Sequence, residues 1–91
     1  MNIYVVFGQT GEYGDYTTWQ VKAFRDEGKA KEHCVFANSK SRDIYRQSDG
    51  WDSLYKVKKQ LENKEIVNEY DPKMQLDYTG TTYYYTITEL E

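Results

Sequence analysis

The chain has 91 residues, and its Lys+Arg total of 12 against an Asp+Glu total of 15 gives a net charge of −3. A chain of this length is expected to form one domain, residues 1–91, and its charge gives no reason to expect general attraction to nucleic acid or anionic lipid. One cysteine and one histidine exclude an internal disulfide and a zinc set of four Cys or His ligands.

The core is expected to be aromatic and thin. Hydrophobic residues make up only 38% of the chain, but aromatic residues reach 16% and include ten tyrosines. Rings must therefore supply much of the buried area. A small domain buries a modest fraction of its surface, and contact with a second copy would bury more. A homodimer is therefore kept as an alternative to a monomer.

The amino terminus is not expected to carry a targeting signal. Met1 to Tyr4 carry no basic side chain, and the apolar run that follows ends at Gly8. This run is too short for a signal peptide or for a helix that spans a membrane. We therefore expect a cytoplasmic protein without a membrane segment.

Two strands are predicted in the first quarter of the chain. Asn2 to Gly8 is β-branched and aromatic at both alternating sets of positions, which favours a central strand. Thr10 to Tyr16 holds two glycines and two acids and is predicted to be a connecting loop. From Thr18 to Phe24, apolar and polar residues alternate, so Trp19, Val21 and Ala23 are expected to face the core.

Two helices are predicted to follow. Asp26 is a plausible N-cap, and an apolar stripe then recurs every three or four residues, at Ala30, Cys34, Ala37, Ser41 and Ile44. The sequence 48–50 interrupts this pattern, and a second stripe begins at Trp51 and ends near Asn63. We expect Trp51 and Leu61 to cover a sheet face made by Val5, Val21 and Tyr85.

The last third of the chain predicts an ordered loop and a final strand. Asn68 to Gly80 has no clear period and contains Pro72, whereas Thr81 to Leu90 alternates Thr, Tyr and Ile as a strand does. The expected fold is α+β with the order ββααβ, in which two helices cover one face of a mainly antiparallel sheet of order 2-1-3. Its third strand is predicted to be antiparallel to the first.

Segments at both ends of the chain resemble a family of small, uncharacterised proteins of bacteriophages and prophages. The resemblance rests on Tyr4 to Gly8, Thr10 to Tyr13, Asp15, Trp19 and Asp77 to Tyr84, and it does not extend to the helical middle. It implies an accessory protein in the cytoplasm of a bacterial host that binds a host or phage protein. Inhibitors of bacterial defence systems, such as anti-CRISPR proteins, belong to this class.

The two loops carry the residues that we predict to contact a partner. If the third strand is antiparallel to the first, both loops lie at one end of the sheet. Tyrosine offers a large, rigid contact surface with a hydroxyl group, and acids at the rim favour a basic partner. The predicted partner-binding residues are Glu12, Tyr13, Asp15, Tyr16, Asp77 and Tyr78.

Two other classes of function remain as alternatives. A small acidic-site or metal-dependent enzyme would use Glu12, Asp15, Asp71 or Asp77, although no calcium-loop spacing is present. A nucleic-acid binder would use a basic helical surface that includes Lys58 and Lys59, with Tyr45 and Tyr55 available for stacking on bases; the members of that surface are Arg42, Arg46, Lys56, Lys58, Lys59 and Lys64. The primary hypothesis is a binding protein that is not an enzyme and has no cofactor. Cys34 is predicted to pack in the core.

Overall fold

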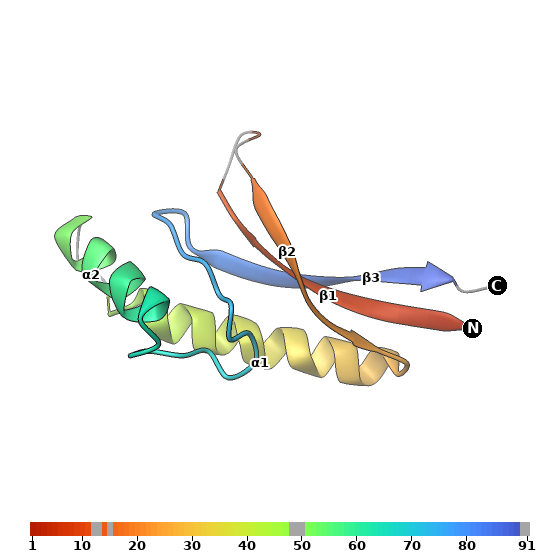
Figure 1. The fold of residues 1–91 in the computed structure, drawn as a ribbon. Helices are drawn as coiled ribbons and strands as arrows, with labels where there is room; N and C mark the ends of the chain where they lie inside the picture. Colours follow the sequence, from red (N-terminus) through yellow and green to blue (C-terminus); the bar gives the residue numbers. More distant parts are fainter. Residues whose placement is uncertain (12–13, 15, 48–50, 90–91) are drawn as a thin grey trace.

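The computed structural model describes residues 1–11, 14, 16–47 and 51–89. Its elements follow the chain in the order β1 (Asn2–Thr10), β2 (Thr17–Phe24), α1 (Glu27–Tyr45), α2 (Trp51–Glu62) and β3 (Thr81–Glu89). The strands form one antiparallel sheet of order β2-β1-β3, and β1 begins at the end of the sheet where β3 ends (Figure 1). The predicted α+β class, element order, strand order and antiparallel third strand are confirmed.

The pairing of β1 with β2 contains an irregularity that changes which residues face the core. Val6 pairs with Lys22 and Phe7 pairs with Gln20, so Val21 is an extra residue on β2. Such a bulge breaks the strict alternation of side chains along a strand. The expectation for Ala23 was therefore wrong: Ala23 is exposed, and Phe24 packs against the core in its place.

Helix α1 covers one face of the sheet. The Asp26 side chain caps it by accepting a hydrogen bond of 3.1 Å from the Lys29 N–H, as expected of an N-cap. Its predicted stripe is buried at every position, from Ala30 to Ile44. Three of these residues, Ala30, Cys34 and Ala37, join Val6 and Tyr83 in the core between helix and sheet. Cys34 is thus a packing residue, as predicted.

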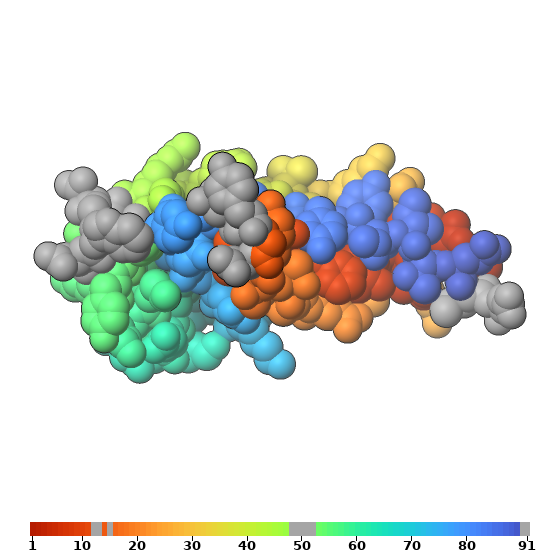
Figure 2. All heavy atoms as spheres, turned by 90° about the horizontal axis from the view of Figure 1, so that it is seen from above, coloured from red at the N-terminus to blue at the C-terminus, as the bar shows by residue number. Residues whose placement is uncertain are grey.

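The prediction that Val5 lies on the sheet face covered by the helices was wrong. Val6 is fully buried against α1, and because side chains alternate along a strand, Val5 points to the opposite face. That opposite face carries a stacked pair of rings, Phe7 and Tyr84, with centroids 5.7 Å apart. Figure 2 shows the three strands open on the side of the molecule that is turned away from α1.

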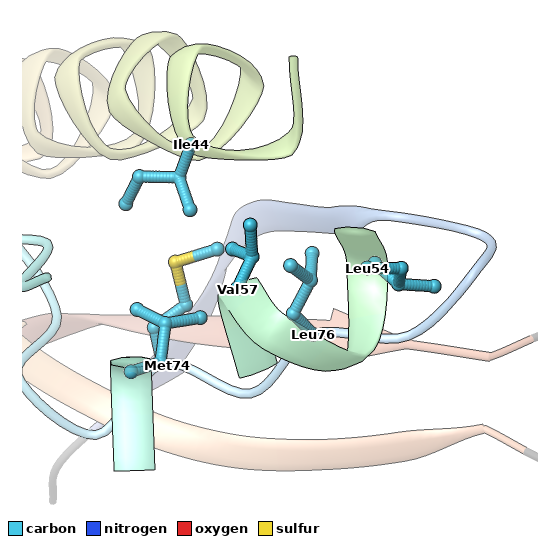
Figure 3. Close-up of a cluster of buried hydrophobic side chains, with 6 residues drawn as sticks. Ile44, Leu54, Val57, Met74 and Leu76 are labelled. Atoms are coloured by element: carbon cyan, nitrogen blue, oxygen red, sulfur yellow. The ribbon is translucent and has the colours of Figure 1, made fainter. Parts of the chain in front are cut away.

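A second hydrophobic cluster lies beyond the sheet, where α2 packs against the end of α1 (Figure 1). Its members among the described residues are aliphatic side chains and a methionine: Ile44, Leu54, Val57, Leu61, Met74 and Leu76 (Figure 3). Leu61 therefore does not cover the sheet face as predicted, because the loop after α2 folds back and places Met74 and Leu76 against it. The prediction for the Trp51 side chain lies outside the described residues.

A buried carboxylate ties this loop to the sheet. Asp71 is 2% exposed, and its Oδ2 accepts hydrogen bonds from Trp19 Nε1 at 2.7 Å and from Tyr83 Oη at 2.8 Å. The Trp19 ring lies over Gly8, where an added Cβ would come within 2.5 Å of the ring. Glycine at this position thus lets the indole lie close to β1 and reach Asp71.

The molecule is elongated, with principal extents of 48 × 27 × 19 Å, because the second cluster extends it past the sheet. In the part of the chain described above, neither helix has the length and apolar character needed to cross a bilayer.

Candidate functional site

The two loops predicted to form a binding surface meet at one end of the sheet. Thr10 pairs with Thr81 in the β1–β3 ladder, so the segments that follow β1 and precede β3 begin side by side. Two hydrogen bonds then join them: Thr10 Oγ1 donates to the Gly80 carbonyl at 2.7 Å, and the Gly11 N–H donates to Thr79 Oγ1 at 2.9 Å. We call this region the loop end. It comprises Gly11, Tyr16 and residues 77–80.

The structure describes half of the predicted partner-binding residues. Glu12, Tyr13 and Asp15 lie outside the described residues. Tyr16 and Tyr78 are 54% and 52% exposed, so each ring presents much of its surface to solvent. The remaining residue, Asp77, is partly buried and serves the turn itself.

Asp77 organises the turn that leads into β3. Its Oδ1 accepts hydrogen bonds from both the N–H, at 2.8 Å, and the hydroxyl of Thr79. The turn closes when the Gly80 N–H donates to the Asp77 carbonyl at 3.0 Å, with Gly80 at a φ of 81° that suits glycine. Partial burial raises the pKa of the Asp77 carboxyl, but the hydrogen bonds from Thr79 outweigh this and hold its pKa below the usual value.

Two further tyrosines, which the sequence predicts to lie near a basic helical surface, are part of the loop end. Tyr45, at the end of α1, donates a hydrogen bond of 2.7 Å from its hydroxyl to the Tyr78 carbonyl. Tyr55, on α2, is 63% exposed and lines a hollow of about 230 Å³ together with Tyr78 and Asp77. The sequence could not group these rings, because their proximity depends on where α2 packs.

The described charges near these tyrosines are mostly positive. Arg42 and Arg46 line a second hollow, of about 320 Å³, beside Tyr45 and residues 79–82. Arg46 Nη1 lies 3.6 Å from Asp43 Oδ1 in an exposed ion pair, and such a pair contributes little to the stability of the fold. Lys58 lines the hollow shared by Tyr55 and Tyr78. The acids expected to attract a basic partner, Glu12 and Asp15, are among the residues outside this description.

A larger groove, of about 540 Å³, runs along the same end of the molecule. Its lining combines charged residues, namely three lysines, Glu62 and Asp77, with the apolar residues Leu61, Met74 and Leu76. The lysines are Lys58, Lys64 and Lys73. A groove with both charges and apolar walls suits a polypeptide segment, which offers both kinds of contact.

Two of the four acids considered for catalysis, Asp71 and Asp77, have structural roles in this arrangement, while Glu12 and Asp15 lie outside the described residues. Asp71 accepts hydrogen bonds from the core, Asp77 holds its turn, and His33 Nε2 lies 2.7 Å from the Tyr70 carbonyl. Burial raises the pKa of the Cys34 thiol, which disfavours the nucleophilic thiolate. Within the described ranges, no three His, Cys, Asp or Glu side chains gather as a metal site requires.

No protein-family model, curated protein or solved structure matches the chain. The site is therefore characterised by its own residues: exposed tyrosines on joined loops, with cationic side chains around them.

Proposed function

We propose that the chain is a small binding protein that contacts a protein partner through the loop end, without catalysing a reaction. The observation that carries this proposal is the exposure of Tyr16, Tyr55 and Tyr78 at one end of the molecule, next to two hydrogen bonds that join the loops. Tyrosine is enriched in protein interfaces because a rigid ring and a hydroxyl give contact area at low entropic cost.

The support is geometric as well as compositional. Tyr78 sits on a turn whose backbone is held by Asp77 and by the Tyr45 hydroxyl, so its ring starts from an ordered backbone. An ordered contact surface loses less conformational entropy on binding than a mobile one. The hollows on either side of this turn can receive side chains of a partner.

The resemblance to small phage and prophage proteins supports an accessory role inside a bacterial host cell. On this proposal the partner is a host or phage protein, and inhibition of a bacterial defence system is the activity that such binding would serve. Inhibition by occlusion needs affinity and no reactive group, which agrees with the structural roles of Asp71 and Asp77.

Affinity capture from bacterial lysates tests the proposal when it is run with matched variants. The wild-type chain is expected to retain one dominant protein, and the Tyr55→Ala/Tyr78→Ala double variant is expected to retain at least tenfold less, since removing an interface tyrosine costs about 2 kcal/mol. Tyr84→Ala removes a tyrosine from the opposite sheet face and should retain the partner. Equal capture by the wild type and the double variant would refute the loop end as the binding surface.

A nucleic-acid partner is the second candidate, favoured by one observation. Lys59 Nζ lies 5.4 Å from the centroid of the Tyr55 ring, and Lys58 lines the adjacent hollow, so an aromatic ring and cations occur together. Binding of this kind weakens steeply with salt, because cations that contact phosphate release counterions. Titration with labelled single-stranded DNA at low and high salt separates this candidate from a protein partner.

A further inference from the structure

The outer edge of β3 is closed along one half and open along the other. In the first half, Asn38 of α1 binds the strand as a neighbouring strand would: Tyr83 N–H donates to its Oδ1 at 2.7 Å, and its Nδ2 donates to the Tyr83 carbonyl at 3.1 Å. Ser41 Oγ donates to the Thr81 carbonyl at 2.9 Å. Helix α1 thus satisfies the edge at Thr81 and Tyr83.

The second half of the same edge has no such cover. Backbone groups alternate in direction along a strand, so those of Tyr85 and Ile87 point the same way as those of Tyr83, away from β1. None of the residues described in this structure bonds to them on that side. The Ile87 side chain is 58% exposed at this point. An open edge beside an exposed aliphatic side chain is a site for pairing with another strand.

The edge of β2 is protected in a different way. Val21 forms a bulge there, and the neighbouring Lys22 is exposed. Bulges and lysines are the devices by which edge strands avoid pairing. The open half of β3 is therefore the part of the sheet that is best suited to accept a new strand.

We propose that Tyr85 to Glu89 pairs antiparallel with the same segment of a second copy of this chain, about a two-fold axis through Ile87. This register places Ile87 against the partner's Ile87, and it sets Thr86 opposite the partner's Thr88. Tyr85 lies opposite the partner's Glu89, so the acids do not face each other. The two exposed isoleucines cover one another, and threonine pairs are favourable across strands.

The structure also restricts the register. Moving the axis two residues toward the carboxyl end would set Glu89 opposite the partner's Glu89, and like charges directly opposite are unfavourable. Moving it two residues the other way would bring the partner strand against Tyr83, whose backbone groups Asn38 already occupies. The axis through Ile87 avoids both conflicts and continues the sheet into the second copy.

The strand pair is short, so the dimer is expected to depend on concentration. Stable interfaces bury about 1,200–2,000 Å² of total surface, and a pair of short strand segments alone falls below this range. Sedimentation equilibrium between about 1 μM and 1 mM should therefore show the mass rising from one chain to two. A constant monomer mass up to the highest concentration would overturn the proposal.

Variants locate the interface. Ile87→Lys, at an exposed position, should keep the circular dichroism spectrum of the fold and weaken self-association at least tenfold. Thr82→Lys, an exposed position in the half of β3 that α1 closes, should associate as the wild type does. Equal association of Ile87→Lys and the wild type would place any dimer elsewhere and contradict the proposal.

Disulfide formation tests the register. Residues opposite each other in a non-hydrogen-bonded antiparallel pair have Cα atoms about 4.5 Å apart, within disulfide range. A mixture of Thr86→Cys and Thr88→Cys chains should form a covalent dimer under oxidising conditions, while neither variant should form one alone. Cross-linking of each variant with itself but not with the other would contradict the two-fold axis through Ile87. These experiments use the purified chain alone, so their result is independent of the proposed partner.

Discussion

The two hydrophobic clusters of this molecule are built in different ways. Between α1 and the sheet, small and aromatic side chains pack beneath hydrogen-bonded strands, and Val6 and Ala37 have no exposed surface. Around α2, aliphatic side chains are enclosed by an irregular loop that contributes Met74 and Leu76 (Figure 3). The first region is held by secondary structure on both sides, whereas the second depends on where a loop lies.

The two regions have different structural roles. The sheet and α1 form the frame, and the second cluster positions Tyr55 next to Tyr78 at the loop end. Asp71 connects them, because it is part of the loop and accepts hydrogen bonds from two residues of the sheet. Loss of this connection, or of packing in the first cluster, should affect both regions, whereas a change within the second cluster should affect mainly that region.

Asp71→Ala is expected to have the largest effect. It leaves Trp19 Nε1 and Tyr83 Oη without their acceptor, and each unsatisfied buried donor costs about 1–3 kcal/mol, so the free energy of unfolding should fall by about 3 kcal/mol. Urea denaturation followed by circular dichroism measures the change. Asp71→Asn keeps an acceptor oxygen and should lose less; an equal loss in both variants would contradict the role of Asp71 as a shared acceptor.

Leu76→Ala should separate the two regions. Truncating a buried leucine costs about 2–5 kcal/mol, and because Leu76 lies in the second cluster, amide hydrogen exchange should accelerate in α2 more than in β1. Val6→Ala is the matched change in the first cluster and should accelerate exchange in both regions. A uniform acceleration in Leu76→Ala would show that the two clusters unfold as one unit.

The smallest effect is expected from acid titration of the loop end. The pKa of Asp77 is lower in the folded chain than in the unfolded chain. At a pH near these two pKa values, the folded state therefore binds fewer protons than the unfolded state. The stability that Asp77 contributes is present above its unfolded pKa of about 3.9 and is lost as the pH falls through the folded value. Thermal unfolding of Asp77→Asn should show a smaller loss of stability than the wild type between about pH 5 and pH 2; parallel pH profiles would contradict the assignment.

The sequence predicted those parts of the fold that depend on local pattern. The buried stripe of α1, its cap at Asp26 and the central position of β1 follow from periodicity and capping chemistry, and the structure contains all three. Periodicity failed at β2, because a single extra residue at Val21 reverses the faces that follow it. A single amino-acid sequence gives no strong indication of where a β-bulge occurs.

The candidate site was predictable only in part. Antiparallel β1 and β3 bring the two loops together, as expected, and Tyr16 and Tyr78 are exposed there. Tyr55 is part of the site because α2 packs on the end of α1 and not over the sheet. The spacing of apolar residues along a helix does not predict where that helix packs. Asp71 was considered for catalysis because it is acidic, but its burial among donors depends on contacts with residues distant in the sequence.

Amide hydrogen exchange of the chain with its captured protein partner tests the central proposal most directly. Binding at the loop end should slow exchange at residues 77–82 and in α2 around Leu54 and Tyr55, since a bound partner excludes solvent from the backbone that it covers. The amides on the far side of α1, around Val35 and Phe36, should exchange at unchanged rates. Protection around Val35 and Phe36 with no change at residues 77–82 would contradict binding through the loop end.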